Sequence, residues 1–502
     1  MDPTRTDWLE RQALYRPARP AVVWDPTGET LTYGDLDRLG ASLARSLAER
    51  FGVGRGGRVA VLAENSLEHV LLFAACQKAG FVLVPLNYRL TAPEVAHLVG
   101  DSDPAVVFVS EECRPLVLDG VPVAPLADVR ALAEGGAGDT GGAGDTGGAA
   151  VAGGAALDDA VLLLYTSGTT GRPKGALYTH RMLVWNAVNT GIRLSLTDAD
   201  VSFNAAPLYH TGGWNVLLTP FLLYGGTTVL LDRFDPDRLL RLCDERRLTI
   251  LWGVPTMLAM LAESPAFEGA NLASVRYAIV GGEPMPAPLT RVWQAKGIPV
   301  RQGFGMTEVG PNCFSLPEAD AVRKMGSIGF PNLFLDVRVV DGAGRDVAAG
   351  ETGELVFRGP VVTPGYWRNP EATAAAFFDD GWFRSGDLVR QDAEGYTYVV
   401  GRLKEMYISG GENVYPAEVE AALREHPAVA EAAVVGVPDA RWGEAGCAFV
   451  VPAAAPPDAA ALLDHCRAHL ARYKVPREVR FLDALPVGHS GKVQKTELAA
   501  LV

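Results

Sequence analysis

Residues 165–175 read YTSGTTGRPKG and directly follow the apolar run AVLLL at residues 160–164. Glycines allow the backbone N–H groups of a loop to converge on an anion, while hydroxyl groups add donors and a lysine adds positive charge. The stretch is not a Walker A loop, because Pro173 stands where that motif requires a glycine before the lysine. We therefore predict a phosphate-binding turn after a buried strand. Its candidate contacts are Thr166, Ser167, Gly168, Thr169, Thr170, Gly171 and Lys174.

Composition limits the possible partners. The chain has 502 residues and a formal net charge of −14, which disfavours nucleic acid or an anionic membrane as a main partner. Its six cysteines are scattered without a CxxC pair, which favours reduced thiols over a zinc site or a disulfide scaffold. The polar N-terminus and the short apolar runs predict no signal peptide and no integral membrane segment. We expect a cytoplasmic protein.

Strand and helix patterns alternate along most of the chain. The stretches at 57–65, 66–80, 81–87, 91–99 and 105–110 follow a βαβ rhythm, which recurs between residues 159 and 296. Alternating residues with a DGAG turn at 336–359 predict antiparallel strands, and the pattern after residue 401 predicts a small α+β unit. The fold class is therefore α/β: large N-terminal α/β sheets, a β-rich subdomain and a small C-terminal α+β domain.

We place the domain boundary near residues 402–404, giving a large domain at 1–402 and a small domain at 403–502. Residues 135–156 are rich in glycine and alanine and repeat GGAGDT. Such a composition buries too little apolar surface to offset the entropy of ordering, so we expect a flexible loop between the two α/β halves.

The opening motif resembles the nucleotide-binding loop of the adenylate-forming acyl-CoA synthetases, a superfamily that also includes insect luciferases and peptide-synthetase adenylation domains. Further stretches resemble that family's patterns in the same order across essentially the whole chain. They are APLYHTGGW (206–214), FGMTEVGP (304–311), GYWRNPEAT (365–373), GWFRSGDLV (381–389), GRLKEMYISGGENVYPAEVE (401–420) and LPVGHSGKVQK (485–495). The resemblance implies activation of a carboxylate with ATP as acyl-AMP, followed by transfer to coenzyme A, in a possible homodimer.

The resemblance also implies roles for single residues around ATP. Lys492 would contact the carboxylate and the α-phosphate, Glu308 would hold Mg²⁺, and Thr307 would hydrogen-bond the α-phosphate. Asp387 and Arg402 would contact the ribose. The remaining adenosine contacts would be Gly281, Gly282, Glu283, Phe304, Gly305 and Met306, with Phe304 in place of the family's usual tyrosine.

Two further functions follow from the resemblance. Lys404 would be the hinge about which the small, mobile domain rotates between the two half-reactions. Ser409, Gly410 and Gly411 would then border the coenzyme A tunnel.

The acid itself is less well specified by the sequence. The acyl pocket is expected to include His210, Trp214, Trp252, Gly282 and Gly305, with His210 either catalytic or a wall residue. No acidic residue follows His210 to hold an ammonium group, which disfavours amino acids. Trp214 and Trp252 favour a medium- or long-chain fatty acid, although either could stack on a ring or fill the core. An aryl acid such as a cinnamate or benzoate is the alternative, and a luciferase-type oxygenase is a further one.

Overall fold

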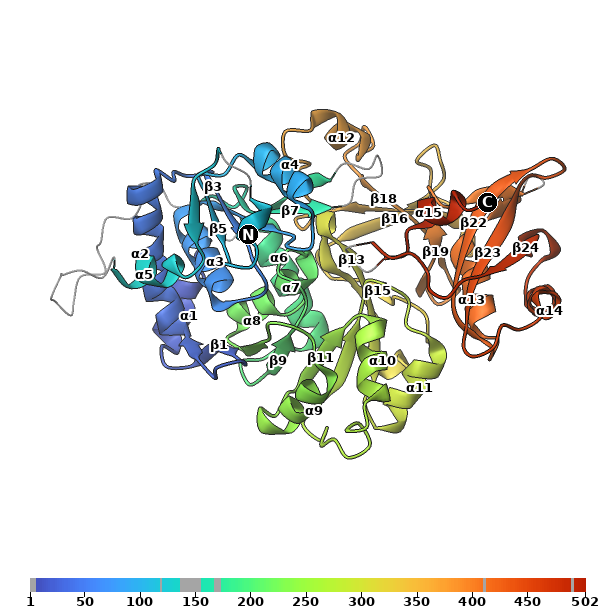
Figure 1. Cartoon of the computed structure of the whole chain (residues 1–502), viewed down its shortest axis with the longest axis horizontal. Helices are drawn as coiled ribbons and strands as arrows, with labels where there is room; N and C mark the ends of the chain where they lie inside the picture. Colours follow the sequence, from blue (N-terminus) through green and yellow to red (C-terminus); the bar gives the residue numbers. More distant parts are fainter. Residues whose placement is uncertain (1–5, 118–119, 136–154, 167–172, 410–411, 489–491) are drawn as a thin grey trace. The chain divides into compact units, whose positions relative to one another are not determined.

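The computed structural model describes residues 6–117, 120–135, 155–166, 173–409, 412–488 and 492–502 (Figure 1). Over these ranges the chain divides into two compact units. Unit 1 comprises Met1–Val337 and Phe357–Phe383, and unit 2 comprises Arg338–Val356 and Arg384–Val502. The predicted α/β class, with a large N-terminal part and a smaller C-terminal part, is confirmed.

The C-terminal compact unit takes in most of the β-rich segment that we assigned to the large domain. Whether the moving part begins at residue 403 stays a prediction. Most of the predicted flexible loop, residues 136–154, lies outside the described residues.

One sheet of unit 1 carries the phosphate-loop motif. Within the described ranges its strand order is β6-β5-β3-β4-β7-β8, parallel except for the antiparallel pair β7 and β8. The strands are β3 (Arg58–Leu62), β4 (Val82–Leu86), β5 (Val106–Val109), β6 (Val123–Pro125), β7 (Ala160–Thr166) and β8 (Lys174–Thr179). Its helical elements are α1 (Leu9–Tyr15), α2 (Tyr33–Phe51), α3 (Leu67–Ala79), α4 (Ala92–Ser102), η1 (Arg114–Leu116) and α5 (Asp128–Gly135).

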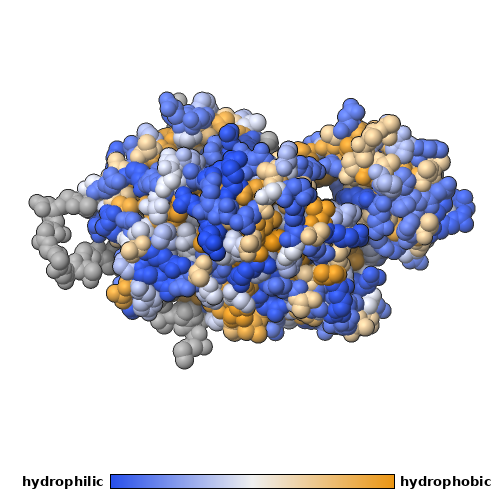
Figure 2. All heavy atoms as spheres, turned by 90° about the horizontal axis from the view of Figure 1, so that it is seen from below, coloured by the Kyte–Doolittle hydropathy of each residue, from blue (hydrophilic) through white to orange (hydrophobic). Residues whose placement is uncertain are grey.

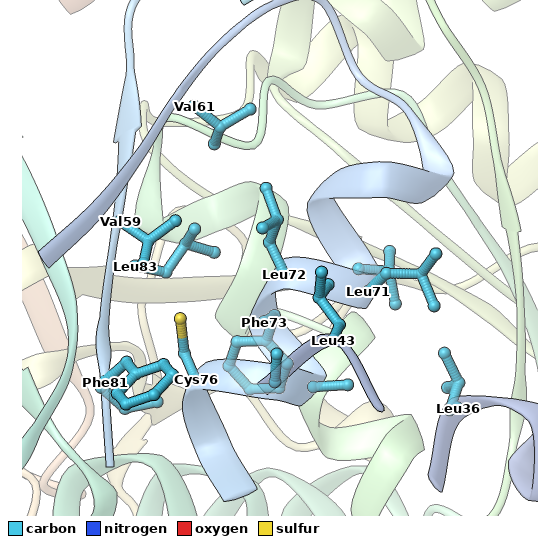
Figure 3. Packing of buried hydrophobic residues seen from close by; sticks show 14 of the residues in the cluster. Leu36, Leu43, Val59, Val61, Leu71, Leu72, Phe73, Cys76, Phe81 and Leu83 are labelled. Atoms are coloured by element: carbon cyan, nitrogen blue, oxygen red, sulfur yellow. The ribbon is translucent and has the colours of Figure 1, made fainter. Parts of the chain in front are cut away.

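This sheet is buried on both faces, which explains its near-continuous apolar strands. Because side chains alternate along a strand, Val59 and Val61 of β3 join one core with residues of α2 and α3, such as Leu72 (Figure 3). Ala60 and Leu62 join a second core with residues of α4.

The second sheet of unit 1 has the order β15-β14-β13-β12-β11-β9-β10-β1-β2 in the described part of the chain. Its strands are β1 (Pro20–Trp24), β2 (Thr30–Thr32), β9 (Val201–Asn204), β10 (Thr227–Leu230), β11 (Ile250–Gly253), β12 (Tyr277–Val280), β13 (Val300–Met306), β14 (Gly310–Ser315) and β15 (Phe330–Pro331). The other elements of this unit are α6 (His180–Leu194), α7 (Thr211–Asn215), α8 (Leu218–Tyr224), α9 (Pro236–Glu245), α10 (Pro255–Glu263), α11 (Ala287–Ala295), η2 (Thr307–Val309), η3 (Glu318–Asp320) and α12 (Pro370–Ala375).

Unit 2 contains two further sheets over its described residues, in the orders β16-β17-β18-β19 and β21-β20-β23-β22, with β24 paired to β23. The strands are β16 (Asp336–Val340), β17 (Thr352–Arg358), β18 (Phe383–Gln391), β19 (Thr397–Arg402), β20 (Tyr407–Ser409), β21 (Glu412–Val414), β22 (Val429–Asp439), β23 (Gly443–Pro452) and β24 (Glu478–Phe481). The helices are α13 (Pro416–Arg424), α14 (Ala459–His469), η4 (Arg472–Lys474) and α15 (Lys495–Ala499).

The surface is mainly polar on the face drawn in Figure 2, where hydrophilic residues predominate and smaller hydrophobic groups lie between them. Among the helices that the structure describes, none combines the length and the apolar character that crossing a bilayer requires.

Candidate active site

The hairpin of β7 and β8 holds both ends of the predicted phosphate loop. Thr166 pairs with Lys174 in the ladder, and the Thr166 hydroxyl donates to the Lys174 carbonyl at 3.4 Å. Five of the predicted contacts lie at 167–172, outside the described residues: Ser167, Gly168, Thr169, Thr170 and Gly171. Their role stays a prediction.

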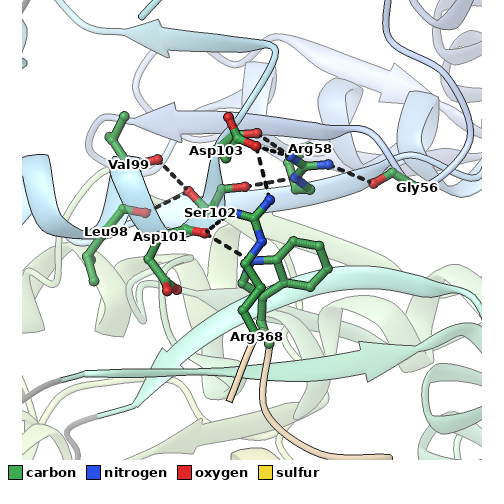
Figure 4. A network of polar contacts seen from close by, with 9 residues as sticks. Gly56, Arg58, Leu98, Val99, Asp101, Ser102, Asp103 and Arg368 are labelled. Atoms are coloured by element: carbon green, nitrogen blue, oxygen red, sulfur yellow. Dashed lines mark hydrogen bonds and ion pairs between the residues drawn. The ribbon is translucent and has the colours of Figure 1, made fainter. Parts of the chain in front are cut away.

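The C-terminal end of α4 anchors two of the motifs (Figure 4). The Tyr165 hydroxyl donates to the Asp101 carboxylate at 2.6 Å, and the indole N–H of Trp367 donates to the Asp101 carbonyl at 3.0 Å. Arg368 reaches the Asp103 carboxylate at 3.1 Å. One helix end therefore ties the start of the phosphate loop to the GYWRN segment, although 192 positions or more separate the two in sequence.

A chain of three side chains links the loop lysine to the predicted magnesium ligand. The Lys174 ammonium lies 5.3 Å from the centre of the Tyr366 ring, within cation–π range. The Tyr366 hydroxyl donates to Glu308 Oε1 at 2.8 Å. Burial, and then the Glu308 charge, raise the pKa of Tyr366, so its hydroxyl keeps the proton that it donates. Glu308 is itself buried.

The FGMTE motif turns from β13 into β14 through η2. A Cβ at Gly305 would lie 2.3 Å from the Pro311 carbonyl carbon, so the close approach at this bulge requires glycine. Thr307 and Glu308 begin η2 directly after Met306. The Phe304 ring, which is half-buried, meets Phe314 edge to face at 6.1 Å.

The predicted base-edge loop, Gly281 to Glu283, follows the end of β12 and is fixed by Gln302 on β13. The Gln302 amide nitrogen donates to the carbonyls of Val280 at 3.3 Å and Glu283 at 3.1 Å, and its oxygen accepts from Met285 N–H. Gly282 has a φ of +84°, which favours glycine.

In unit 2, the two predicted ribose contacts face each other on neighbouring strands. Asp387 of β18 is the ladder partner of Arg402 of β19, with the guanidinium Nε 3.0 Å from the carboxylate. Burial raises the pKa of Asp387, while the charges of Arg402 and Lys492 oppose that rise. The predicted catalytic lysine therefore lies close enough to this carboxyl group to act on it electrostatically.

Lys492 is the first described residue after the gap at 489–491. Its carbonyl accepts from Gly488 N–H at 2.8 Å, and Val487 pairs with Val493. The side chain is exposed. Lys404 is also exposed, in the turn after β19.

Ser409 is buried at the end of β20, whereas Gly410 and Gly411 lie outside the described residues. The hinge and coenzyme A roles of these residues stay predictions.

His210 directly precedes α7 and belongs to an aromatic row. Its ring lies 4.5 Å from that of Tyr209, which meets Tyr88 at 5.5 Å, with the Arg89 guanidinium 5.6 Å from the Tyr88 ring centre. His210 is half-buried. The row offers flat surfaces next to the predicted acyl-binding histidine.

The two predicted pocket tryptophans differ in their surroundings. Trp214 is fully buried, stacks on Phe73 of α3 at 5.2 Å, and donates its indole N–H to the Leu208 carbonyl. These are the contacts of a core residue, which is the reading that the sequence left open. Trp252 donates to the Phe203 carbonyl at 3.1 Å, and its ring edge lies 3.6 Å from where a Cβ on Gly212 would stand.

Sequence reasoning missed three residues that hold the site. Tyr366 lies inside a quoted motif, and Gln302 lies two residues before Phe304, the first residue of another motif, so their positions carried a signal. Asp101 stands at the end of α4 without any motif, and nothing local marks its contact with Tyr165.

The family comparison matches nearly the full chain. Residues 9–367 match the family described as AMP-binding enzyme, and residues 418–492 match the AMP-binding enzyme C-terminal domain.

Two curated relatives illustrate the range of acids. A feruloyl-CoA synthase from Amycolatopsis sp. is 44% identical over 98% of this chain and 97% of its own length. The long-chain-fatty-acid–CoA ligase FadD13 of Mycobacterium tuberculosis is 37% identical over 98% of this chain and 97% of its own length.

Solved structures share the fold. The o-succinylbenzoate CoA synthetase MenE of Bacillus subtilis, in complex with its acyl-adenylate intermediate, is 32% identical over 99% of this chain and 98% of that chain, with a TM-score of 0.86. A second structure of the same protein, with ATP and a magnesium ion, gives a TM-score of 0.84 over 98% of each chain.

Proposed function

Because this chain belongs to the AMP-binding enzyme family and is an adenylate-forming CoA ligase, we propose that its acid substrate is an aryl carboxylic acid related to ferulate. The observation that carries this choice is the core position of Trp214. The preference for a fatty acid depended largely on a tryptophan beside an acyl tunnel, and the burial of Trp214 and its stacking on Phe73 give that preference no support. The 44% identity to a feruloyl-CoA synthase points in the same direction.

An aromatic acid also suits the surroundings of His210. Tyr209 and Tyr88 present ring faces and edges next to this histidine, and aromatic pairs gain about 0.5–1.5 kcal/mol beyond their buried area. We propose that Trp252 and the bare backbone of Gly212 border the pocket, since the Trp252 ring edge lies 3.6 Å from where a Cβ on Gly212 would stand. In this proposal Gly282 and Gly305 border the same pocket, where side chains would leave less room.

The first half-reaction joins two anions. The acid's carboxylate oxygen attacks the α-phosphorus of ATP, a bond to that phosphorus forms, and pyrophosphate leaves. Lys174 and Lys492 are the cations proposed to offset this repulsion, with Lys174 at the polyphosphate and Lys492 at the reacting carboxylate. The turn at 167–172 and Thr307 supply hydrogen-bond donors.

Glu308 fits a magnesium site by its chemistry. Its carboxylate is buried, lies beside the Lys174 and Tyr366 pair, and provides the hard oxygen that Mg²⁺ prefers. A bound Mg²⁺ would neutralise phosphate charge. The Tyr366 hydroxyl orients this carboxylate, so we assign it a positioning role.

We propose that Phe304, Met306 and the Gly281 to Glu283 loop contact the base, and that Asp387 and Arg402 contact the ribose hydroxyls. A buried carboxylate accepts hydrogen bonds from a diol well, and the charge of Arg402 opposes the rise in the pKa of Asp387 that burial causes.

The second half-reaction transfers the acyl group. The coenzyme A sulfur attacks the acyl carbonyl, a thioester forms, and AMP leaves. We propose that residues 403–502 rotate about Lys404 between the two steps, withdrawing Lys492 and bringing Ser409, Gly410 and Gly411 to the pantetheine arm. The narrow arm would pass close to backbone where these glycines stand.

The substrate proposal is tested by giving the protein ATP, Mg²⁺ and coenzyme A with ferulate, cinnamate, benzoate, octanoate and palmitate in parallel. We expect a hydroxycinnamate thioester with the highest kcat/KM, together with AMP and pyrophosphate. A higher kcat/KM with palmitate would contradict the aryl assignment but keep the ligase, and would agree with the likeness to FadD13. Oxygen uptake with a supplied adenylate would instead support the oxygenase alternative.

A further inference from the structure

Unit 2 contains a cluster of side chains of metal-ligating types, none of which has been assigned to the reaction. The cluster comprises Glu425, His465 and His469, whose ligand atoms all lie within 4.8 Å of one another. His465 and His469 stand one turn apart on α14, and Glu425 caps the C-terminus of α13. We propose that these three residues bind a divalent transition-metal ion, with Zn²⁺ as the best fit, and that the ion braces α13 against α14.

The hydrogen bonds of the two histidines prepare them as ligands. His465 Nε2 lies 2.9 Å from the Ala422 carbonyl, and His469 Nδ1 lies 2.8 Å from the His465 carbonyl. Because a carbonyl only accepts, each of these nitrogens carries the proton. The neutral rings then keep a lone pair at His465 Nδ1 and at His469 Nε2. Metal-binding histidines characteristically donate their other N–H to a carbonyl or carboxylate in this way.

The neighbouring His426 is arranged differently and serves as a control. Its ring lies 5.2 Å from that of His465, but its Nδ1 accepts from Ala428 N–H at 3.2 Å. In the neutral ring the proton is then at Nε2, so no lone pair remains for a metal. His426 is therefore a near neighbour of the site without being a ligand.

The backbone also favours a cation here. Glu425 and His469 stand at the C-terminal ends of α13 and α14, where unsatisfied carbonyls give each helix a partial negative charge. Two helix ends of the same sign and one carboxylate therefore meet at the cluster.

The donor set selects the type of ion. Two imidazoles and one carboxylate suit Zn²⁺, Co²⁺ or Ni²⁺ better than Mg²⁺, which prefers oxygen. Ligand atoms around one tetrahedral Zn²⁺ are separated by roughly 3.4 Å, given bonds of about 2.1 Å. The exposed side chains of Glu425 and His469 can rotate to close that gap, while His465 is half-buried. A water molecule would take the fourth position.

The test uses the full chain without a histidine tag and without ATP, which would chelate the ion. Zn²⁺ is titrated calorimetrically, and Co²⁺ is titrated while its visible absorption is recorded. We expect one equivalent of either ion to bind, a rise in the melting temperature on adding Zn²⁺, and a visible band from tetrahedral Co²⁺. His469→Gln and Glu425→Gln should each weaken binding by at least about tenfold, while His426→Gln should bind as the parent does.

Both altered side chains are exposed, so the variants are expected to melt like the parent in the absence of metal. The proposal is overturned if no ion binds, if His469→Gln keeps the parent affinity, or if His426→Gln loses as much affinity as His469→Gln. Because these measurements need neither substrate nor turnover, their failure would leave the ligase assignment untouched.

Discussion

The Tyr366 hydroxyl donates a hydrogen bond to Glu308 Oε1 across 2.8 Å, which joins the GYWRN and FGMTE motifs through their side chains. The backbone joins them as well, because Thr363 N–H donates to the Glu308 carbonyl at 2.7 Å. The Lys174 ammonium lies over the ring of the same tyrosine. Tyr366 therefore contacts both a phosphate-loop cation and the proposed magnesium ligand.

Tyr366→Phe should therefore impair magnesium use more than folding. A hydrogen bond to a charged group contributes about 1.5–3 kcal/mol, so we expect a loss of that order in the free energy of unfolding. The half-saturating Mg²⁺ concentration for adenylation should rise severalfold. Tyr15→Phe, at an exposed tyrosine, is the matched control. An unchanged Mg²⁺ dependence in Tyr366→Phe would show that the tyrosine does not position Glu308.

Gln302→Leu should weaken ATP binding, although Gln302 is not among the residues proposed to contact ATP. The substitution removes the amide that holds the Gly281 to Glu283 loop and takes a hydrogen bond from the buried Val280 carbonyl, at a cost of about 1–3 kcal/mol. We expect the KM for ATP to rise more than the KM for the acid, as steady-state kinetics would measure. Gln294→Leu on α11 is the control. Equal rises in both KM values would contradict this role.

Asp387→Asn should lower the adenylation activity while raising the stability of the folded protein. Burial raises the pKa of Asp387 in the folded protein above its ordinary value of 3.8. The folded state therefore favours the protonated form of Asp387. As the pH rises above about 4, the carboxyl group ionises more readily in the unfolded chain, and the free energy of unfolding falls. Asn cannot ionise, so the variant should gain stability relative to the parent between pH 4 and the raised pKa, and keep that gain at neutral pH.

Thermal melts of the parent and of Asp387→Asn at pH 4 and pH 7.5 measure this difference. Adenylation should fall by about 100-fold, because the ribose loses its charged acceptor. The stability of the variant minus that of the parent is compared at the two pH values. If this difference is smaller at pH 7.5 than at pH 4, the ion pair with Arg402 outweighs the desolvation of Asp387.

Gly212→Ala should alter the acid preference and leave folding intact. The added Cβ would stand 3.6 Å from Trp252, which is an ordinary contact without a clash. If this wall borders the acid, kcat/KM should fall more for ferulate than for a smaller acid such as benzoate. The ratio of the two values, measured in one preparation, decides the point. An unchanged ratio would place the aryl ring elsewhere.

The sequence indicates the architecture well because its apolar periodicity is strong. The βαβ rhythm expected between residues 159 and 296 corresponds to strands and helices of the structure, such as β7, α9 and α11. The weaker elements β24 and α15 were not predicted, since each is short and partly exposed.

The sequence predicts less of the site than of the fold. Motifs place Glu308 and Asp387 by spacing, but the contacts that orient them come from residues 58 positions away in one case and from a neighbouring strand in the other. Trp214 illustrates the limit: a tryptophan in a motif can face a pocket or the core, and only packing against Phe73 distinguishes the two.

Exchange of labelled pyrophosphate into ATP, with Mg²⁺ and ferulate but without coenzyme A, examines acyl-adenylate formation by itself. We expect exchange that depends on the acid, and we expect Lys492→Ala to abolish it while still converting supplied feruloyl-AMP to the thioester. Exchange that requires coenzyme A, or release of ADP in place of AMP, would contradict adenylation as the chemistry of this protein.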